Sequence, residues 1–211
     1  GRHMVKAGTQ YRNRIVTDTG TEEPRSIPGV TFTHLMKVDD VRLKDFFYVD
    51  CTWYWNATGQ PTVTEALVSN VSQVISFVGL NPSDPHDLRG QISVWIDGEK
   101  QVFDRSCLVF VPAGISFGPV QINRLDGPLF YSVISPKAAD QVKLNKPEKN
   151  YSIITTTKTK SEEPPPMTSV HSSRILHMED DMVRGSFYVD FVWLYEGFGV
   201  LPAPGHDHEW E

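Results

Sequence analysis

The sequence predicts an all-β protein: one complete jelly-roll barrel followed by the opening strands of a second repeat. About eight short apolar segments between residues 30 and 134 are separated by Gly, Pro and Asp turns, which is the strand count of a jelly roll. Helical periodicity is almost absent. The stretch FYVDCTWYWNATG at 47–59 returns as FYVDFVWLYEGFG at 187–199, an offset of 140 residues (187 − 47), which indicates an internal duplication.

Composition narrows the function classes. The 211 residues carry a net charge of −6, and no run of Lys or Arg offers a surface for phosphates, so we expect no nucleic-acid partner. The apolar stretches are far shorter than the roughly 20 residues of a spanning helix, so no membrane is expected. Cys51 and Cys107 form no CxxC pair and are too few for a disulfide-built scaffold. A cytoplasmic location follows as an expectation.

The chain divides into five parts. Residues 1–4 (GRHM) have the form of an expression-tag remnant, and 5–28 form an N-terminal arm without assigned chemistry. Residues 29–136 form the first barrel, and the Lys-, Thr- and Pro-rich 137–168 form a linker. The second repeat begins at 169 and runs to 211.

Alternating or continuous apolar residues place the strands of the first barrel. A polar turn at Asp97-Gly98 separates two of them, and the segment 80–90 (LNPSDPHDLRG) is expected to be a loop. The expected strands are 30–38, 46–55, 62–70, 73–79, 91–96, 107–111, 120–123 and 129–134.

Two motifs carry a family resemblance. Pro112-Ala113-Gly114 is followed after two residues by Phe117, and the chain ends on GHDHEWE, with His206 and His208 two residues apart. The first resembles the second cupin motif, whose position at Phe117 is a metal-binding histidine. The second resembles the opening of the first cupin motif, HxH followed by Glu. The sequence is therefore similar to two-domain cupins, with a degenerate first barrel and a truncated second one.

The first barrel is expected to bind no metal and to have a filled interior. An ungapped alignment of the repeats places Ala66 opposite His206 and Val68 opposite His208. Neither these residues nor Phe117 offers a lone pair to a metal. Ser72 or Gln73 stands where the family has its Glu. We therefore expect no cofactor in this barrel.

His206 and His208 have two interpretations. Residues two apart on a strand share a face, so both imidazoles would point into a barrel and ligate Fe, Mn, Ni, Cu or Zn. Such a site needs further ligands, which the resemblance places beyond Glu211 in a longer protein. The alternative is a solvated terminus that binds metal only adventitiously.

The other candidates favour structural roles. His34, His86, His171 and His177 lack acidic or cysteine partners at metal spacing. Asp50 and Asp190, at equivalent points of the repeats, form either a catalytic pair or the same structural hydrogen bond made twice. Trp53, Tyr54 and Trp55 form either a stacking platform for a ligand or packed core. Cys107 is expected to be a buried thiol.

Two functions remain open. In the first, the protein is a bicupin with a structural first barrel, and the second repeat begins a metal site for oxygenase, lyase or isomerase chemistry on a small molecule; the catalytic residues are not identified. In the second, it is a non-catalytic binding or interaction protein without metal. A pocket would then involve Trp53, Trp55, Asn70, Gln73 and Tyr131. The exposed strands of the second repeat lead us to expect a homodimer.

Overall fold

The computed structural model describes residues 16–19, 25–43, 47–81, 83–84, 86–135 and 152–154, and the backbone alone of 170–178 and 189–197. Its regular elements are all strands, and the described residues include no helix. In chain order the strands are β1 (Val30–Val38), β2 (Tyr48–Ala57), β3 (Thr62–Thr64), β4 (Leu67–Val68), β5 (Gln73–Gly79), β6 (Asp87–Ile96), β7 (Glu99–Arg105), β8 (Cys107–Val111), β9 (Ser116–Leu125), β10 (Leu129–Ser135), β11 (Ser152–Ile154), β12 (Val170–Met178) and β13 (Val189–Gly197).

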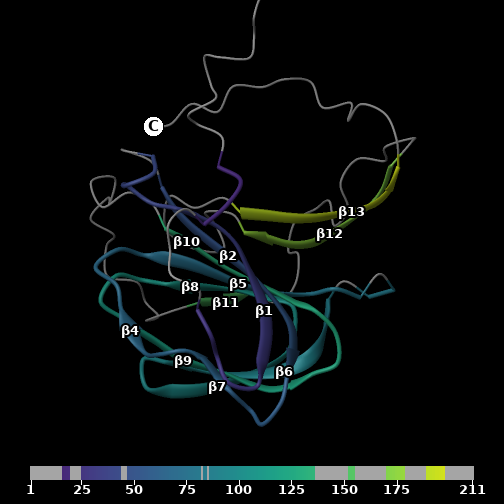
Figure 1. Ribbon diagram of the computed structural model, residues 1–211. Helices are drawn as coiled ribbons and strands as arrows, with labels where there is room; N and C mark the ends of the chain where they lie inside the picture. The colour runs from purple at the N-terminus through teal and green to yellow at the C-terminus, as the bar shows by residue number, and fades with distance from the viewer. Residues whose placement is uncertain are drawn as a thin grey trace, which may run out of the picture.

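Eleven of these strands form a jelly-roll barrel of two antiparallel sheets. One sheet has the order β1-β2-β10-β5-β8-β11 and the other β3-β9-β6-β7, with β4 pairing to β9. The two sheets lie one above the other in Figure 1. The chain passes repeatedly between the sheets, as in a jelly roll. It changes sheet from β2 to β3, from β4 to β5, from β5 to β6, from β7 to β8, from β8 to β9 and from β9 to β10. The expectation of an all-β jelly roll is confirmed.

Apolar side chains between the sheets fill one part of the barrel. Strands β5 and β8 are buried along nearly their whole length, while β6 alternates buried with exposed residues at its start. The side chains of Phe77, Leu88 and Ile92 are fully buried. Gly79 lies so close to β6 that a Cβ there would be 2.3 Å from the carbonyl oxygen of Asp87. A side chain at this position would push the two sheets apart.

Several boundaries differ from the expected ones. Strand β7 (EKQVFDR) was expected to be a polar turn, but it pairs with β6 and buries only Phe103 while its charged residues face solvent. Strand β6 begins inside the expected loop 80–90. Strand β11 lies inside the expected linker 137–168 and pairs with β8. Edge strands need few apolar residues, which explains why β7 and β11 gave weak sequence signals.

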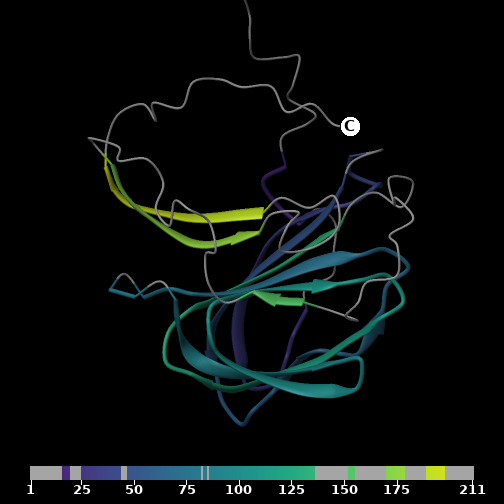
Figure 2. The same ribbon diagram turned by 180° about the vertical axis from the view of Figure 1, so that it is seen from behind.

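Strands β12 and β13 form a pair with the same register as β1 and β2. Strand β12 pairs with β13 as a separate two-stranded sheet, shown in Figure 2. All eight pairs of this ladder, from Val170↔Gly197 to Met178↔Val189, equal those of β1 and β2 shifted by 140 residues, and both register irregularities recur at the same places. The backbone thus supports the duplication. Within the described residues β12 and β13 pair only with each other.

Candidate functional site

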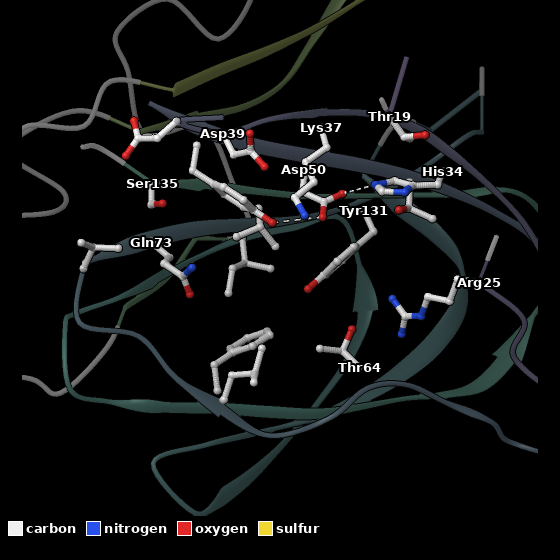
Figure 3. Close-up of a pocket in the computed structure, with 18 of the residues that line it drawn as sticks. Thr19, Arg25, His34, Lys37, Asp39, Asp50, Thr64, Gln73, Tyr131 and Ser135 are labelled. Carbon is white, nitrogen blue, oxygen red and sulfur yellow. Dashed lines mark hydrogen bonds and ion pairs between the residues drawn. The ribbon is translucent and has the colours of Figure 1, made fainter. Parts of the chain in front are cut away.

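A cavity of about 1260 Å³ occupies the barrel where the apolar core ends. Side chains reach it from strands of both sheets, from the loops after β1 and β4, and from the N-terminal arm. Figure 3 shows Asp50, Tyr131, Thr64 and Arg25 around its central space. The expectation that the barrel interior is filled is therefore wrong for this part of the molecule.

Strand β2 supplies one wall because its side chains alternate between two faces. Tyr48, Asp50, Thr52 and Tyr54 line the cavity. The intervening residues include Cys51, Trp53 and Trp55, which are not among the lining residues. On the neighbouring strand β10, Tyr131, Val133 and Ser135 follow the same two-residue spacing. Adjacent strands therefore present one continuous and mostly polar surface to the cavity, interrupted by Val133.

His34, Asp50 and Tyr48 form a hydrogen-bonded group on this surface. The Nε2 of His34 lies 2.7 Å from Oδ1 of Asp50, and the hydroxyl of Tyr48 donates to Oδ2 of Asp50 at 3.1 Å. Since the carboxylate can only accept, Nε2 of His34 carries the proton of this bond. The side chains of His34 and Asp50 are 25% and 28% exposed, so the cavity admits water to this group. Both carboxylate oxygens of Asp50 have protein donors.

Tyr54 and Tyr131 face the cavity near its apolar end. Their rings lie 6.1 Å apart between centroids, and Figure 3 shows Thr64 near the hydroxyl of Tyr131. Burial raises the pKa of Tyr131, and burial likewise raises the pKa of Tyr54 to about 12, against a lowering by the charge of Arg25. Both phenols therefore keep their protons at neutral pH and are available as hydrogen-bond donors.

Arg25 brings a positive charge to the cavity from the N-terminal arm. Its Nη2 donates to the carbonyl oxygen of Val63 in β3. Among the described residues no carboxylate forms an ion pair with Arg25. The same arm reaches the cavity a second time through Thr19. The arm, to which the sequence assigned no chemistry, thus supplies the guanidinium of the site.

The structure brings together three of the five residues expected in a pocket. Asn70, Gln73 and Tyr131 line the cavity. Trp53 and Trp55 do not, because their places on β2 alternate with those of the lining residues. These two indoles instead stack on each other with ring centroids 5.4 Å apart, and Trp53 also contacts Phe130 at 5.2 Å. Trp55 is 43% exposed.

The residues expected at the lost metal positions have different environments. Phe117 is buried and lines the cavity. Ala66 and Val68 are exposed and do not line it, whereas Leu67 between them does and pairs with Phe117. The two positions that the ungapped alignment pairs with His206 and His208 therefore do not face the cavity, because neighbouring residues on a strand face opposite sides. Ser72 is buried, and its hydroxyl accepts from the backbone N–H of Ala113.

The structure does not describe the side chains of most remaining candidates. His206 and His208 lie outside the described residues, and His171, His177 and Asp190 are described by backbone alone. Over the described ranges there is no group of three or more His, Cys, Asp or Glu that could hold a metal ion. A metal-free first barrel remains a prediction.

Both cysteine side chains are buried free thiols. Burial, together with the nearby carboxylate of Asp50, raises the pKa of Cys51 to about 11. Burial alone raises the pKa of Cys107. Both groups are therefore thiols rather than thiolates at neutral pH, as the sequence led us to expect for Cys107.

Sequence reasoning missed the two most informative contacts of the cavity, the His34–Asp50 bond and the placement of Arg25 against Val63. Asp50 was compared only with its repeat partner, and His34 was judged isolated because no acidic residue is near it in sequence. The two meet across β1 and β2, at alternating positions of adjacent strands, which was the signal available. Nothing in the arm's composition singled out Arg25.

Comparisons with known proteins show only distant likeness. No known protein family matches the sequence, and no curated protein matches it. Among solved structures, a putative glyoxylate-induced protein from Pseudomonas aeruginosa is 11% identical with a TM-score of 0.48; the match covers 81% of this chain and 57% of that one. An oxalate oxidase in complex with the substrate analogue glycolate is 12% identical with a TM-score of 0.40, covering 73% of this chain and 68% of that one.

A predicted oxalate decarboxylase from Thermotoga maritima is 13% identical with a TM-score of 0.36, and the match covers 59% of this chain and 96% of that one. At these values the likenesses carry no argument about activity. The described part of the chain contains no helix of the length and apolarity needed to cross a bilayer.

Proposed function

We propose that the first barrel is a binding domain for a small organic molecule, held in the cavity by hydrogen bonds and apolar contact. The observation that carries this proposal is the convergence of polar groups on one side of the cavity, where Arg25, Thr64 and Tyr131 face the same space (Figure 3). Ligand sites in proteins are mostly apolar concave surfaces with a few placed polar groups. A binding function requires polar groups in addition to Asn70 and Gln73, and Arg25 and Thr64 are such groups in the lining.

The apolar part of the lining supports the same proposal. Phe32, Ile75, Phe117 and Val133 line the cavity beside the polar groups. Phe117 occupies the place where the cupin motif has a metal-binding histidine. Recognition of a ligand here would therefore depend on hydrogen bonds and apolar contacts with side chains. The resemblance to cupins, with their small-molecule chemistry, agrees with such a ligand.

A matched pair of variants tests the binding function. Leu67 and Val68 are adjacent, 65% and 66% exposed, and only Leu67 lines the cavity. We expect ligand-observed NMR with a library of small organic molecules to find ligands whose affinity falls about tenfold or more, or about 1.4 kcal/mol, in Leu67→Trp and stays unchanged in Val68→Trp. Ligands affected equally by both substitutions, or an absence of ligands, would refute the proposal.

A second function belongs to the second repeat. We propose that His206 and His208 begin a site for Fe, Mn, Ni, Cu or Zn in a bicupin, with oxygenase, lyase or isomerase chemistry completed by further residues. Its support is the repeated strand register of β12 and β13, which indicates a second repeat of the same kind. If the second repeat contains one residue more than the first between Gly199 and His206, the offset becomes 141 and His208 aligns with Leu67. Leu67 is the residue of β4 that lines the cavity in the first barrel. A homodimer and a cytoplasmic location remain proposals.

A further inference from the structure

We infer that the cavity binds a small monocarboxylate with an apolar or aromatic body, and that the guanidinium of Arg25 pairs with its carboxylate. This inference rests on the proposed binding function and names the class of ligand. Three features of the cavity carry it: the placement of Arg25, the neutral donors opposite it, and the combination of acidic rim and apolar wall.

Among the described residues, the guanidinium of Arg25 is held in place by a single hydrogen bond, which uses one of its N–H groups. The bond from its Nη2 to the carbonyl of Val63 fixes the guanidinium against β3. A guanidinium has five N–H donors and binds carboxylates through two parallel bonds. No carboxylate of the described residues pairs with it. A guanidinium that faces a cavity, with no carboxylate partner among the described residues, is placed to form an ion pair with an anionic group of a ligand.

The groups opposite Arg25 are donors without charge. Figure 3 shows the guanidinium directed toward the space in front of Tyr131 and Thr64. Tyr54 lies close enough that the charge of Arg25 acts on its phenol. Hydroxyl groups of Tyr and Thr donate to carboxylate oxygens as readily as to each other. An anion between them and Arg25 would therefore receive hydrogen bonds from several directions.

The charged groups of the lining favour a ligand with a single negative charge, because the three carboxylates of Asp39, Asp40 and Asp50 outnumber the two cations, Arg25 and Lys37. Asp50 already receives hydrogen bonds from His34 and Tyr48. At the rim, Asp39 accepts from the backbone N–H groups of Val41 and Arg42, and its neighbour Asp40 also lines the cavity. A phosphate monoester, with about −1.5 to −2 charges near neutral pH, would be repelled by these carboxylates more than a monocarboxylate.

The apolar wall predicts the rest of the ligand. Phe32 and Tyr54 lie with ring centroids 6.0 Å apart, and Phe117, Ile75 and Val133 continue the wall. Aromatic rings bury large areas and prefer tilted or offset neighbours at this separation. A ring or short alkyl chain attached to the carboxylate would contact this wall while Arg25 binds the anion.

The test compares four probes on the full chain by isothermal titration calorimetry: benzoate, acetate, phenyl phosphate and benzyl alcohol. Benzoate is expected to bind more tightly than the other three. In Arg25→Gln its affinity should fall about tenfold or more, the loss expected for a charge-assisted hydrogen bond. The matched control is Arg105→Gln, an exposed arginine of β7 outside the cavity, for which benzoate affinity should stay within about twofold. Benzyl alcohol should bind Arg25→Gln as it binds the unaltered protein, which shows that the variant cavity is folded.

The outcomes separate this inference from the proposed function. Phenyl phosphate binding more tightly than benzoate would overturn the assignment of a carboxylate. Benzoate binding that is equal in Arg25→Gln and the unaltered protein would overturn the role of Arg25. In either case, if binding is still lost in Leu67→Trp and kept in Val68→Trp, the binding function of the cavity stands. Binding of none of the four probes overturns the inference, and the library screen then decides the proposed function separately.

Discussion

The bond between His34 and Asp50 predicts a measurable coupling between these two residues. Replacing Asp50 by Ala removes the acceptor of both His34 and Tyr48. Replacing His34 by Ala removes the shorter of the two bonds, 2.7 Å in length. If the bond stabilises the fold, the double variant should lose less stability than the sum of the two single variants.

The size of the coupling follows from the burial of the pair. Hydrogen bonds to a charged group contribute about 1.5–3 kcal/mol when well buried, and exposed ion pairs contribute about 0–1 kcal/mol. With side chains 25% and 28% exposed, His34 and Asp50 lie between these cases. We therefore expect a coupling of about 1 kcal/mol, and about 2 kcal/mol of destabilisation for Asp50→Ala alone, because it also leaves Tyr48 without its acceptor.

Urea denaturation followed by tryptophan fluorescence measures these free energies of unfolding. Asn123→Ala serves as the control partner, since Asn123 bonds to Ser93 and Gln91 in the other sheet. Combined with Asp50→Ala it should be additive within about 0.5 kcal/mol. A His34–Asp50 cycle that is additive to the same degree would refute the reasoning, because it would mean that water replaces the bond without loss.

Three further predictions concern the thiols and the second repeat. Because burial raises the pKa values of Cys51 and Cys107, neither should react with a disulfide reagent in the folded protein at pH 8, while both react in denaturant; fast labelling of the folded chain would contradict their burial. Stability contributed by the protonated Cys51 is present below pH 9 and should be lost as the pH rises through about 11, measurable as a falling free energy of unfolding. For the second repeat, metal analysis by mass spectrometry on a bicupin chain that also carries the completing ligands should find near-stoichiometric transition metal that is lost in the His206→Ala/His208→Ala variant; equal metal in both proteins would contradict a site at these histidines.

The fold could be predicted from the sequence because strand alternation is a local property. Segments such as 73–79 and 107–111 carry continuous apolar residues, and the structure buries them in the centre of one sheet. Strand β7 could not be predicted in this way, since an edge strand with one buried residue leaves little pattern. The duplication was visible because identical residues recur, and its backbone counterpart is the repeated register of β12 and β13.

The site was less accessible to sequence reasoning because its residues meet only in three dimensions. Asp50 and His34 are on different strands, and an irregularity between His34 and Met36 shifts their register. Arg25 reaches the cavity from a segment whose path no periodicity predicts. Trp53 and Trp55 were candidates because they are large aromatic residues. They lie on the same face of β2 as Cys51, and the cavity lies on the opposite face with Thr52, which the sequence alone does not distinguish.

The most direct test of the cavity as a ligand site is a nuclear Overhauser measurement on the chain with bound benzoate. Our account predicts contacts from the benzoate ring protons to the methyl groups of Leu67 and Val133 and to the ring of Tyr131, all of which line the cavity. Contacts to the indoles of Trp53 and Trp55 and to the ring of Phe130, with none to the cavity residues, would contradict it and would place the ligand on the stacked aromatic surface instead.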